Sequence, residues 1–263
     1  MPQTHATLAP LATLPEVRTV PVGEPFGWLV RGLRDMRANP FASLFYGACI
    51  AAMGFLLFFY TRQEVKYIAT LTSGFLLAGP FVAIGLYDIS RRIEQGDEVA
   101  LGPTTVAWHE NANQFAIMGA ILGLVMLAWT GVALTIFDAF YGKESPSLAQ
   151  FIADAMSMKH TAFLIAYTAA GSVFAAVVFV LSVVSIPMLL DRNCDALTAM
   201  RTSVLAVAQN PATMLVWAGL NTTLTLLGLW TFYVGIIVTM PVIGHASWHA
   251  YRGLVRSESD PPA

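Results

Sequence analysis

PFVAIGLYDISRR (residues 80–92) and PVIGHASWHAYRG (residues 241–253) follow one plan, and this plan decides the fold. Each stretch begins with a proline inside an apolar run and reaches an arginine eleven residues later, at Arg91 and at Arg252. Each also carries an aromatic residue followed by a polar one, YD or WH, at the same offset. The plan predicts a membrane helix that bends at its proline, holds its ring at headgroup level and ends beyond the bilayer.

A second shared feature lies upstream of both stretches. Asn39-Pro40 and Asn210-Pro211 each follow an amphipathic stretch and precede apolar sequence. The chain is therefore expected to consist of helical hairpins built to a repeated plan.

The composition indicates an all-α polytopic membrane protein. Of 263 residues, 56% are hydrophobic and 11% are charged, whereas soluble domains are about 25% charged. A membrane-spanning helix needs about 20 mostly apolar residues. Five windows without lysine, arginine, aspartate or glutamate are this long: 41–60, 67–87, 111–137, 161–190 and 202–251.

The number of transmembrane helices depends on residues 212–244, which form either a hairpin turning near residues 221–223 or one long tilted helix. The hairpin gives six spans and the single helix gives five. Six is favoured, because it places ten lysine and arginine residues on the inner side and four on the outer, with both termini cytoplasmic. The expected organisation is a disordered cytoplasmic tail (1–24), one membrane domain (25–254) and a disordered tail (255–263).

Two amphipathic helices are expected to lie along the cytoplasmic surface of the bilayer, at residues 26–37 and 195–209. In the first, Leu33 shares the apolar face while Arg34 and Asp35 lie on the polar side. In the second, Met200 belongs to the apolar face.

Much of the chain, from about residue 26 to 254, resembles a bacterial family of predicted integral membrane proteins of unknown function. The resemblance rests on the Asn-Pro steps, on SRRIEQG (residues 90–96) and above all on GHASWHAYR (residues 244–252). It implies a location in the bacterial inner membrane and no established activity. Some members of the family are labelled as similar to subunit I of cytochrome c oxidase.

The candidate functional site lies where the two defining stretches end. His245 and His249 are four residues apart, so they share one helical face. The site comprises eight residues from the two stretches: Tyr87, Asp88, Arg91, His245, Trp248, His249, Tyr251 and Arg252. If the hairpins are related by pseudo-symmetry, Asp88 is expected to orient one imidazole, although pairing with the neighbouring arginines at the surface is the favoured interpretation of this carboxylate.

Metal or haem binding is an alternative for the two histidines. The spacing of His245 and His249 can present both rings to one metal ion, but haem would need a histidine from another helix. The chain has five histidines and no adjacent pair, so it lacks the pattern of a haem–copper oxidase core. Interfacial histidines bonded to headgroups or backbone are the favoured interpretation.

The net charge of −2 and the absence of basic blocks argue against a nucleic-acid partner. No phosphate-binding loop, zinc-protease or nucleophile-elbow motif occurs, so an enzyme is not supported. Two functions stay open. One is a non-catalytic scaffold or accessory subunit that contacts lipid and other membrane proteins. The other is a small-solute or ion transporter or channel built from repeated hairpins.

Overall fold

The structure, a computed structural model, describes residues 14–61, 67, 79, 81–142 and 146–256. Within these ranges the chain is helical apart from turns, loops and one bridge between Val17 and Val255, which confirms the all-α class. The helices are α1 (Glu24–Ala38), α2 (Pro40–Thr61), α4 (Ile84–Gln95), α5 (Leu101–Thr105), η1 (Ala107–Asn111), α6 (Ala112–Tyr141), α7 (Leu148–Met156), α8 (Thr161–Ser182), α9 (Ser185–Asp191), α10 (Ala196–Gln209), α11 (Pro211–Trp230) and α12 (Ile236–Leu254).

Four helical stretches in the described part of the chain are long and apolar enough to cross a membrane. They are Pro40–Phe59, Leu101–Tyr141, Thr161–Asp191 and Pro211–Trp230. The second expected span includes the uncharged window 67–87 and extends to residue 90. Residues 68–78 and 80 lie outside the described residues, and residues 84–90 form the start of α4.

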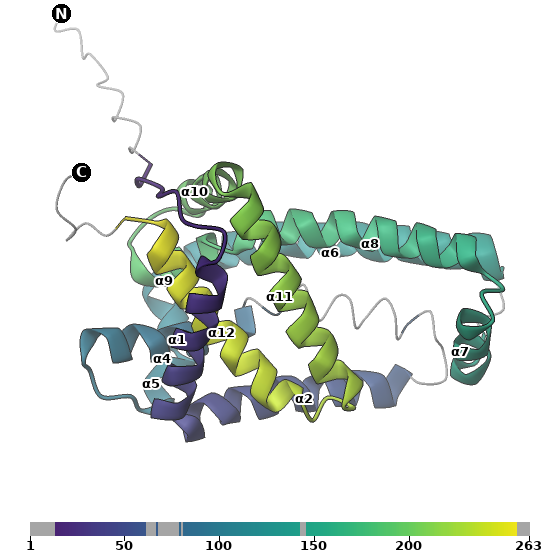
Figure 1. The fold of residues 1–263 in the computed structure, drawn as a ribbon, viewed down its shortest axis with the longest axis horizontal. Coiled ribbons are helices and arrows are strands. Elements are labelled where there is room, and N and C mark those ends of the chain that lie inside the picture. The colour runs from purple at the N-terminus through teal and green to yellow at the C-terminus, as the bar shows by residue number, and fades with distance from the viewer. Residues whose placement is uncertain (1–13, 62–66, 68–78, 80, 143–145, 257–263) are drawn as a thin grey trace, which may run out of the picture.

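Figure 1 shows the long helices α2, α6 and α8 running in a common direction, with α1 oriented across that direction at one end of the molecule. Helix α12 is the hub of this end, because it packs against α1, α2, α4, α9 and α11. Helices α6 and α8 form a separate hairpin that extends away from the hub and meets α7 at its far end (Figure 1).

The two Asn-Pro steps break the chain in the same way. Asn39 has φ −133° and ψ 66°, and Asn210 has φ −126° and ψ 48°, so both residues leave the helical region. Proline disfavours a helical conformation for the residue before it but is well placed at the start of the next helix. Each step therefore ends a short helix and begins a long apolar one.

Glycines allow α12 to approach its neighbours closely. A Cβ added to Gly32 of α1 would lie 2.6 Å from the backbone nitrogen of Ala246 and 2.9 Å from the carbonyl oxygen of Val242. A Cβ added to Gly47 of α2 would overlap the carbonyl of Ile237. Small residues at such crossings bring backbones together, as they do in membrane helix packing.

Residues 212–244 form two helices joined by a turn at residues 231–235, but the expected turn near residues 221–223 is wrong. Thr222 lies inside α11, where its hydroxyl donates a 2.9 Å hydrogen bond to the carbonyl of Ala218 and leaves the helix unbroken. The turn instead uses Phe232 and Tyr233, which have φ of 50° and 67°.

The expected fourth span is one apolar stretch that contains a break. Helix α8 ends at Ser182 and α9 begins at Ser185, two residues before Pro187. Proline cannot donate a backbone hydrogen bond to the preceding turn, which explains the break. Val184 N–H bonds to the hydroxyl of Ser203 on α10 instead, at 3.2 Å.

The predicted disordered tails are wrong for the residues next to the helices. Arg18 N–H donates to the carbonyl of Leu254 at 2.7 Å, and Arg256 N–H donates to the carbonyl of Glu16 at 3.0 Å. Asn210 holds the same segment, because its side chain accepts from Val20 N–H at 2.8 Å. Residues 14–20 and 254–256 therefore lie side by side.

The short helices α1 and α10 form where expected, but the predicted position of Asp35 on the water-facing side of α1 is wrong. Asp35 is buried with Trp28 and Gly32 against α12, while Phe26 and Val30 are exposed. In α10 the buried face includes Met200 and small residues, and Leu197 is exposed.

Candidate functional site

Helices α4 and α12 carry all eight residues of the predicted site, and the two helices pack against each other. Their contact is close at Gly244, where an added Cβ would lie 2.6 Å from Cδ1 of Leu86. Five of the eight side chains are buried and the other three are partly buried. The buried ones are Tyr87, Asp88, His245, Trp248 and Tyr251, and the partly buried ones are Arg91, His249 and Arg252.

A first group of polar contacts joins α1, α2, α4 and α12, and we name it the Asp35 network: Asp35, Ser43, Ser90, His245 and His249. Nε2 of His245 lies 2.9 Å from Oγ of Ser43, and its Nδ1 lies 2.8 Å from Oγ of Ser90. Ser90 Oγ lies 2.6 Å from Oδ2 of Asp35. Nε2 of His249 lies 2.8 Å from the same oxygen.

One assignment of hydrogen-bond donors and acceptors accounts for all four contacts of this network, with Asp35 ionised and His245 neutral. The Ser43 hydroxyl donates to Nε2 of His245, whose Nδ1–H donates to Ser90. Ser90 and His249 then both donate to the carboxylate of Asp35. The Ser43 hydroxyl also lies 2.8 Å from the carbonyl of Asn39, and its single proton serves one of these acceptors at a time.

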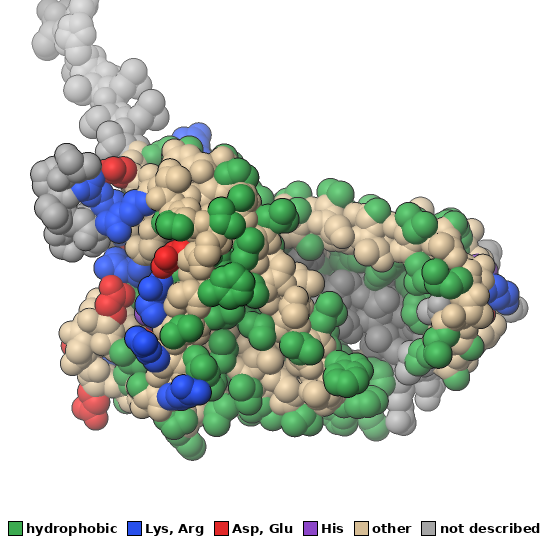
Figure 2. All heavy atoms as spheres, in the orientation of Figure 1, with side chains coloured by type: hydrophobic (Ala, Val, Ile, Leu, Met, Phe, Trp, Pro, Cys, Tyr) green, Lys and Arg blue, Asp and Glu red, His purple; other side chains and the backbone are tan. Residues whose placement is uncertain are grey.

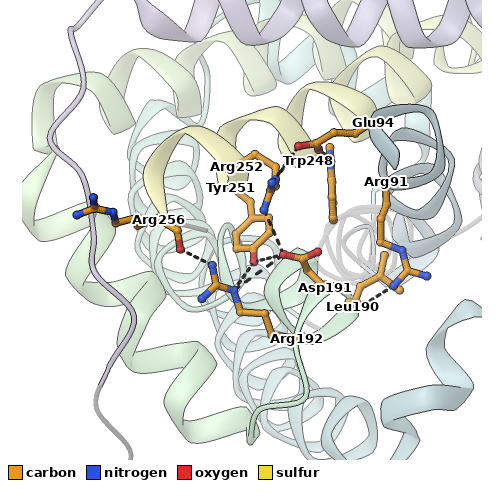
Figure 3. Close-up of polar contacts among 9 residues, drawn as sticks. All are labelled: Arg91, Glu94, Leu190, Asp191, Arg192, Trp248, Tyr251, Arg252 and Arg256. Atoms are coloured by element: carbon orange, nitrogen blue, oxygen red, sulfur yellow. Dashed lines mark hydrogen bonds and ion pairs between the residues drawn. The ribbon is translucent and has the colours of Figure 1, made fainter. Parts of the chain in front are cut away.

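A second group, the Asp191 network, joins α4, α9 and α12 (Figure 3) and comprises Glu94, Asp191, Arg192, Trp248, Tyr251 and Arg252. The Tyr251 hydroxyl donates to Asp191 at 2.6 Å and accepts from Nε of Arg192 at 2.9 Å. Glu94 accepts from Nε1 of Trp248 at 2.8 Å and from Nε of Arg252 at 3.0 Å. Arg192 also donates to the backbone carbonyl of Arg256, which fixes the end of the chain.

Asp88 pairs with its neighbouring arginines, as expected, but the pair is buried at Asp88 and does not lie at the surface. It is 0% exposed and contacts Arg91 Nη2 at 2.6 Å and Arg92 Nε at 2.8 Å. Arg91 also donates to the carbonyl of Leu190 at 2.8 Å. The expectation that Asp88 orients an imidazole is wrong, because Asp35 takes that position next to His249.

The remaining candidate, Tyr87, is buried on α4 and hydrogen-bonds the side chain of Ser247 on α12. It therefore joins the two helices a third time, beside both networks.

Metal binding by the histidines stays a prediction, and the geometry gives it little support. Both nitrogens of His245 lie within hydrogen-bond distance of serine hydroxyls, and Nε2 of His249 faces Asp35. In the described part of the chain, no group of three or more histidine, cysteine, aspartate or glutamate side chains could hold a metal ion. His109 lies edge-on against Trp108, and His160 lies against Tyr141.

The Asp35 network contains the residue types of a serine–histidine–aspartate site, but its arrangement differs. In a triad the carboxylate bonds directly to the histidine that activates the serine, whereas here Ser90 stands between His245 and Asp35. Ser43, Ser90 and His245 are 0–1% exposed, so a substrate does not reach the hydroxyl groups. The arrangement holds helices together and orders protons.

The link between α9 and α10 carries two shifted groups. Burial raises the pKa of the Cys194 thiol to about 11, so this cysteine is protonated and unreactive at neutral pH. Asp195 is the N-cap of α10; the Thr198 hydroxyl and N–H donate to its carboxylate and lower its pKa below the ordinary value.

The helices long enough to cross a membrane and the exposed apolar surface of α6 and α8 define an integral membrane protein. Residues 68–191, slightly less than half of the chain, match the family model described as predicted integral membrane protein (DUF2189). This confirms the resemblance to a membrane protein family of unknown function. The GHASWHAYR stretch lies outside the matched residues, and no finding supports the likeness to subunit I of cytochrome c oxidase. No curated protein and no solved structure matches the chain.

Proposed function

We propose that the protein is a non-catalytic scaffold or accessory subunit of the bacterial inner membrane, with six spans and both termini in the cytoplasm. The observation that carries this proposal is that the hydrogen-bonding groups of the candidate site already have partners within the chain. The side chains able to do acid–base chemistry are bonded to one another across four helices, and Ser43, Ser90 and His245 are buried.

The pairing of the two chain ends supports an even number of membrane crossings. Residues 14–20 and 254–256 are hydrogen-bonded to each other, so they lie on the same side of a bilayer. The proposed six spans are the four candidate spans, the expected span at residues 67–90 and α12, which is not one of those four candidates. Figure 2 shows many of the visible charged side chains gathered at the end formed by α1, α4 and the chain ends, as expected for the cytoplasmic side.

The α6–α8 hairpin supports a role in binding other membrane components. It extends from the hub and exposes Leu124 (66%), Leu127 (69%) and Ile165 (64%). In a bilayer this surface contacts lipid or another membrane helix.

Photocrosslinking in intact membranes tests the proposal. A photoreactive phenylalanine analogue at Leu127, exposed on α6, is expected to give a defined protein adduct that copurifies with the tagged chain. The matched control places it at Trp129, on the same helix but 2% exposed, where only contacts within the chain are expected. Lipid adducts alone at Leu127, with nothing copurifying in native detergent, would contradict the scaffold role.

A second candidate function, a small-solute transporter or channel, is favoured by one observation. A cavity of about 380 Å³ lies between α2, α4, α8, α11 and α12, and α12 contains an internal proline at Pro241. Substrate-dependent flux in proteoliposomes that is abolished by filling the cavity, for example with Ala175→Trp, would favour this function over the scaffold.

A further inference from the structure

We infer that the cavity between α4, α8, α11 and α12 binds a neutral membrane lipid through a single hydroxyl group. This goes beyond the scaffold role and holds whether or not a protein partner is found. The argument rests on the charge of the lining, on two unpaired polar atoms and on the position of the cavity among the candidate spans.

The lining is apolar and carries no charge in the described part of the chain. Residues such as Val178, Phe179 and Leu229 form most of it, and no lysine, arginine, histidine, aspartate or glutamate contributes. Bringing a phosphate or ammonium group into such a space without a partner charge is costly. The occupant is therefore neutral, and the volume of about 380 Å³ suits part of a lipid or a similarly small molecule.

Two polar atoms of the lining are buried without a hydrogen-bond partner among the described residues. They are Nε1 of Trp217, a donor, and Oδ1 of Asn221, an acceptor. The two residues are four apart on α11, so they lie on one face of the helix. Trp217 is 0% exposed, and its ring is held edge-on against Trp28 with 5.6 Å between the ring centroids.

Both serine side chains of the lining are already bonded. The Ser182 hydroxyl donates to the carbonyl of Val178, and that of Ser247 donates to the carbonyl of Ile243. Buried polar groups in proteins nearly always have partners, so an unpaired donor and acceptor on one face call for a ligand. A hydroxyl group suits both atoms, because it can accept from Trp217 and donate to Asn221.

The cavity is placed to take this ligand from the bilayer. About half of its lining comes from α8 and α11, which are candidate membrane spans. Leu226 lines it and is 59% exposed, so the cavity reaches the lipid-facing surface. A diacylglycerol-like lipid could place its hydroxyl at Trp217 and Asn221 while the rest of its chains stay in the membrane.

The test uses the purified full chain in nanodiscs and measures binding of 1,2-dioleoylglycerol by native mass spectrometry. Trp217→Phe and Asn221→Leu are each expected to weaken binding about fivefold, the effect of one lost hydrogen bond. The methyl ether of the same lipid, which can accept but cannot donate, is expected to bind the parent about fivefold more weakly. Matched controls on the same helix are Trp230→Phe, at an 82% exposed position, and Thr223→Leu, also exposed; both are expected to bind as the parent does.

Thermal stability without lipid provides a second readout. Removing a buried atom that has no partner leaves stability unchanged or raises it, so lipid-free Asn221→Leu is expected to be at least as stable as the parent. A clear loss of stability would mean that the amide already has a partner and would overturn the inference. Equal binding of the alcohol and its methyl ether, or unchanged binding by both cavity variants, would overturn it as well.

Discussion

Replacing Asp35 by alanine tests how much the Asp35 network stabilises the fold. The carboxylate of Asp35 accepts hydrogen bonds from Ser90 at 2.6 Å and from His249 at 2.8 Å, and the residue is 7% exposed. A hydrogen bond to a charged group contributes about 1.5–3 kcal/mol, so two bonds contribute about 3–6 kcal/mol. Because the variant also removes a buried charge that is costly to desolvate, we expect a net loss near the lower figure, about 3 kcal/mol.

The assay is thermal unfolding in detergent, followed by tryptophan fluorescence at one fixed heating rate. For chains of about this size, 1 kcal/mol corresponds to about 2–4 °C in Tm, so Asp35→Ala is expected to lower the apparent Tm by about 6–12 °C. Asp35→Asn keeps an acceptor oxygen and loses the charge, so we expect about half of that effect.

Asp138→Ala is the matched control, because Asp138 is an exposed aspartate near the end of α6. It is expected to change Tm by less than about 2 °C, as surface substitutions usually do. If Asp35→Ala unfolds within 2 °C of this control, the network does not stabilise the packing of α1 on α12 and the reasoning fails.

Three further predictions concern packing, capping and the chain ends. Gly32→Ala places a methyl group 2.6 Å from the Ala246 nitrogen and should destabilise the fold by about 1–3 kcal/mol. Gly27→Ala on the same helix meets only ordinary contacts and should leave the stability unchanged. Thermal unfolding of the two variants tests this difference. Asp195→Ala removes the α10 cap and should lose about 1 kcal/mol at pH 7. Because the folded pKa of Asp195 lies below the ordinary value of 3.8, this stabilisation is present above that value and is lost as pH falls through the folded pKa, so the stabilities of parent and variant should converge in acid. Val17 and Val255 pair in the structure, so replacing both by cysteine should allow a disulfide to form on mild oxidation. Mass spectrometry after proteolysis would detect the disulfide, and failure to form it would argue against the pairing of residues 14–20 with 254–256.

The repeated plan could be predicted from the sequence because a proline restricts the backbone conformation of the residue directly before it. Each Asn-Pro step ends one helix and begins the next through the steric demands of the proline ring, independent of distant residues. The shared offset of the two defining stretches likewise predicted that α4 and α12 would lie together if their hairpins are related, and the two helices do pack against each other. Long uncharged windows predicted helices of membrane-spanning length for the same reason, since burial in lipid is decided by composition over about 20 residues.

The role of Asp35 could not be predicted from helical periodicity. Its spacing places it near Arg34 on the polar side of α1, and in a surface helix that side faces water. Its position is decided by α12, which contacts α1 on the Trp28, Gly32 and Asp35 face. The signal in the sequence was Gly32, a glycine between a tryptophan and an acid on one helical face, which is typical of a close helix crossing.

The turn between α11 and α12 was misplaced for a related reason. Asn221, Thr222 and Thr223 form a polar cluster that suggests a loop, yet Thr222 bonds to its own helix and Asn221 faces the cavity. A polar residue in a membrane helix can mark a ligand position as readily as a turn, and local sequence does not separate the two. The packing of α8 against the same space decides between them.

The pairing of the site residues also determines what a partner can recognise. Asp88 is neutralised by Arg91 and Arg92, and Glu94 and Asp191 both contact Arg252. Charges of the site are thus compensated inside the chain, and the proposed scaffold role would rely on the surface outside these networks. That surface includes exposed arginines of the two short helices, Arg34, Arg37 and Arg201. Arginines in this position favour anionic headgroups or an acidic partner segment, so a scaffold that binds at the cytoplasmic face would do so through α1 and α10 and leave the histidines undisturbed.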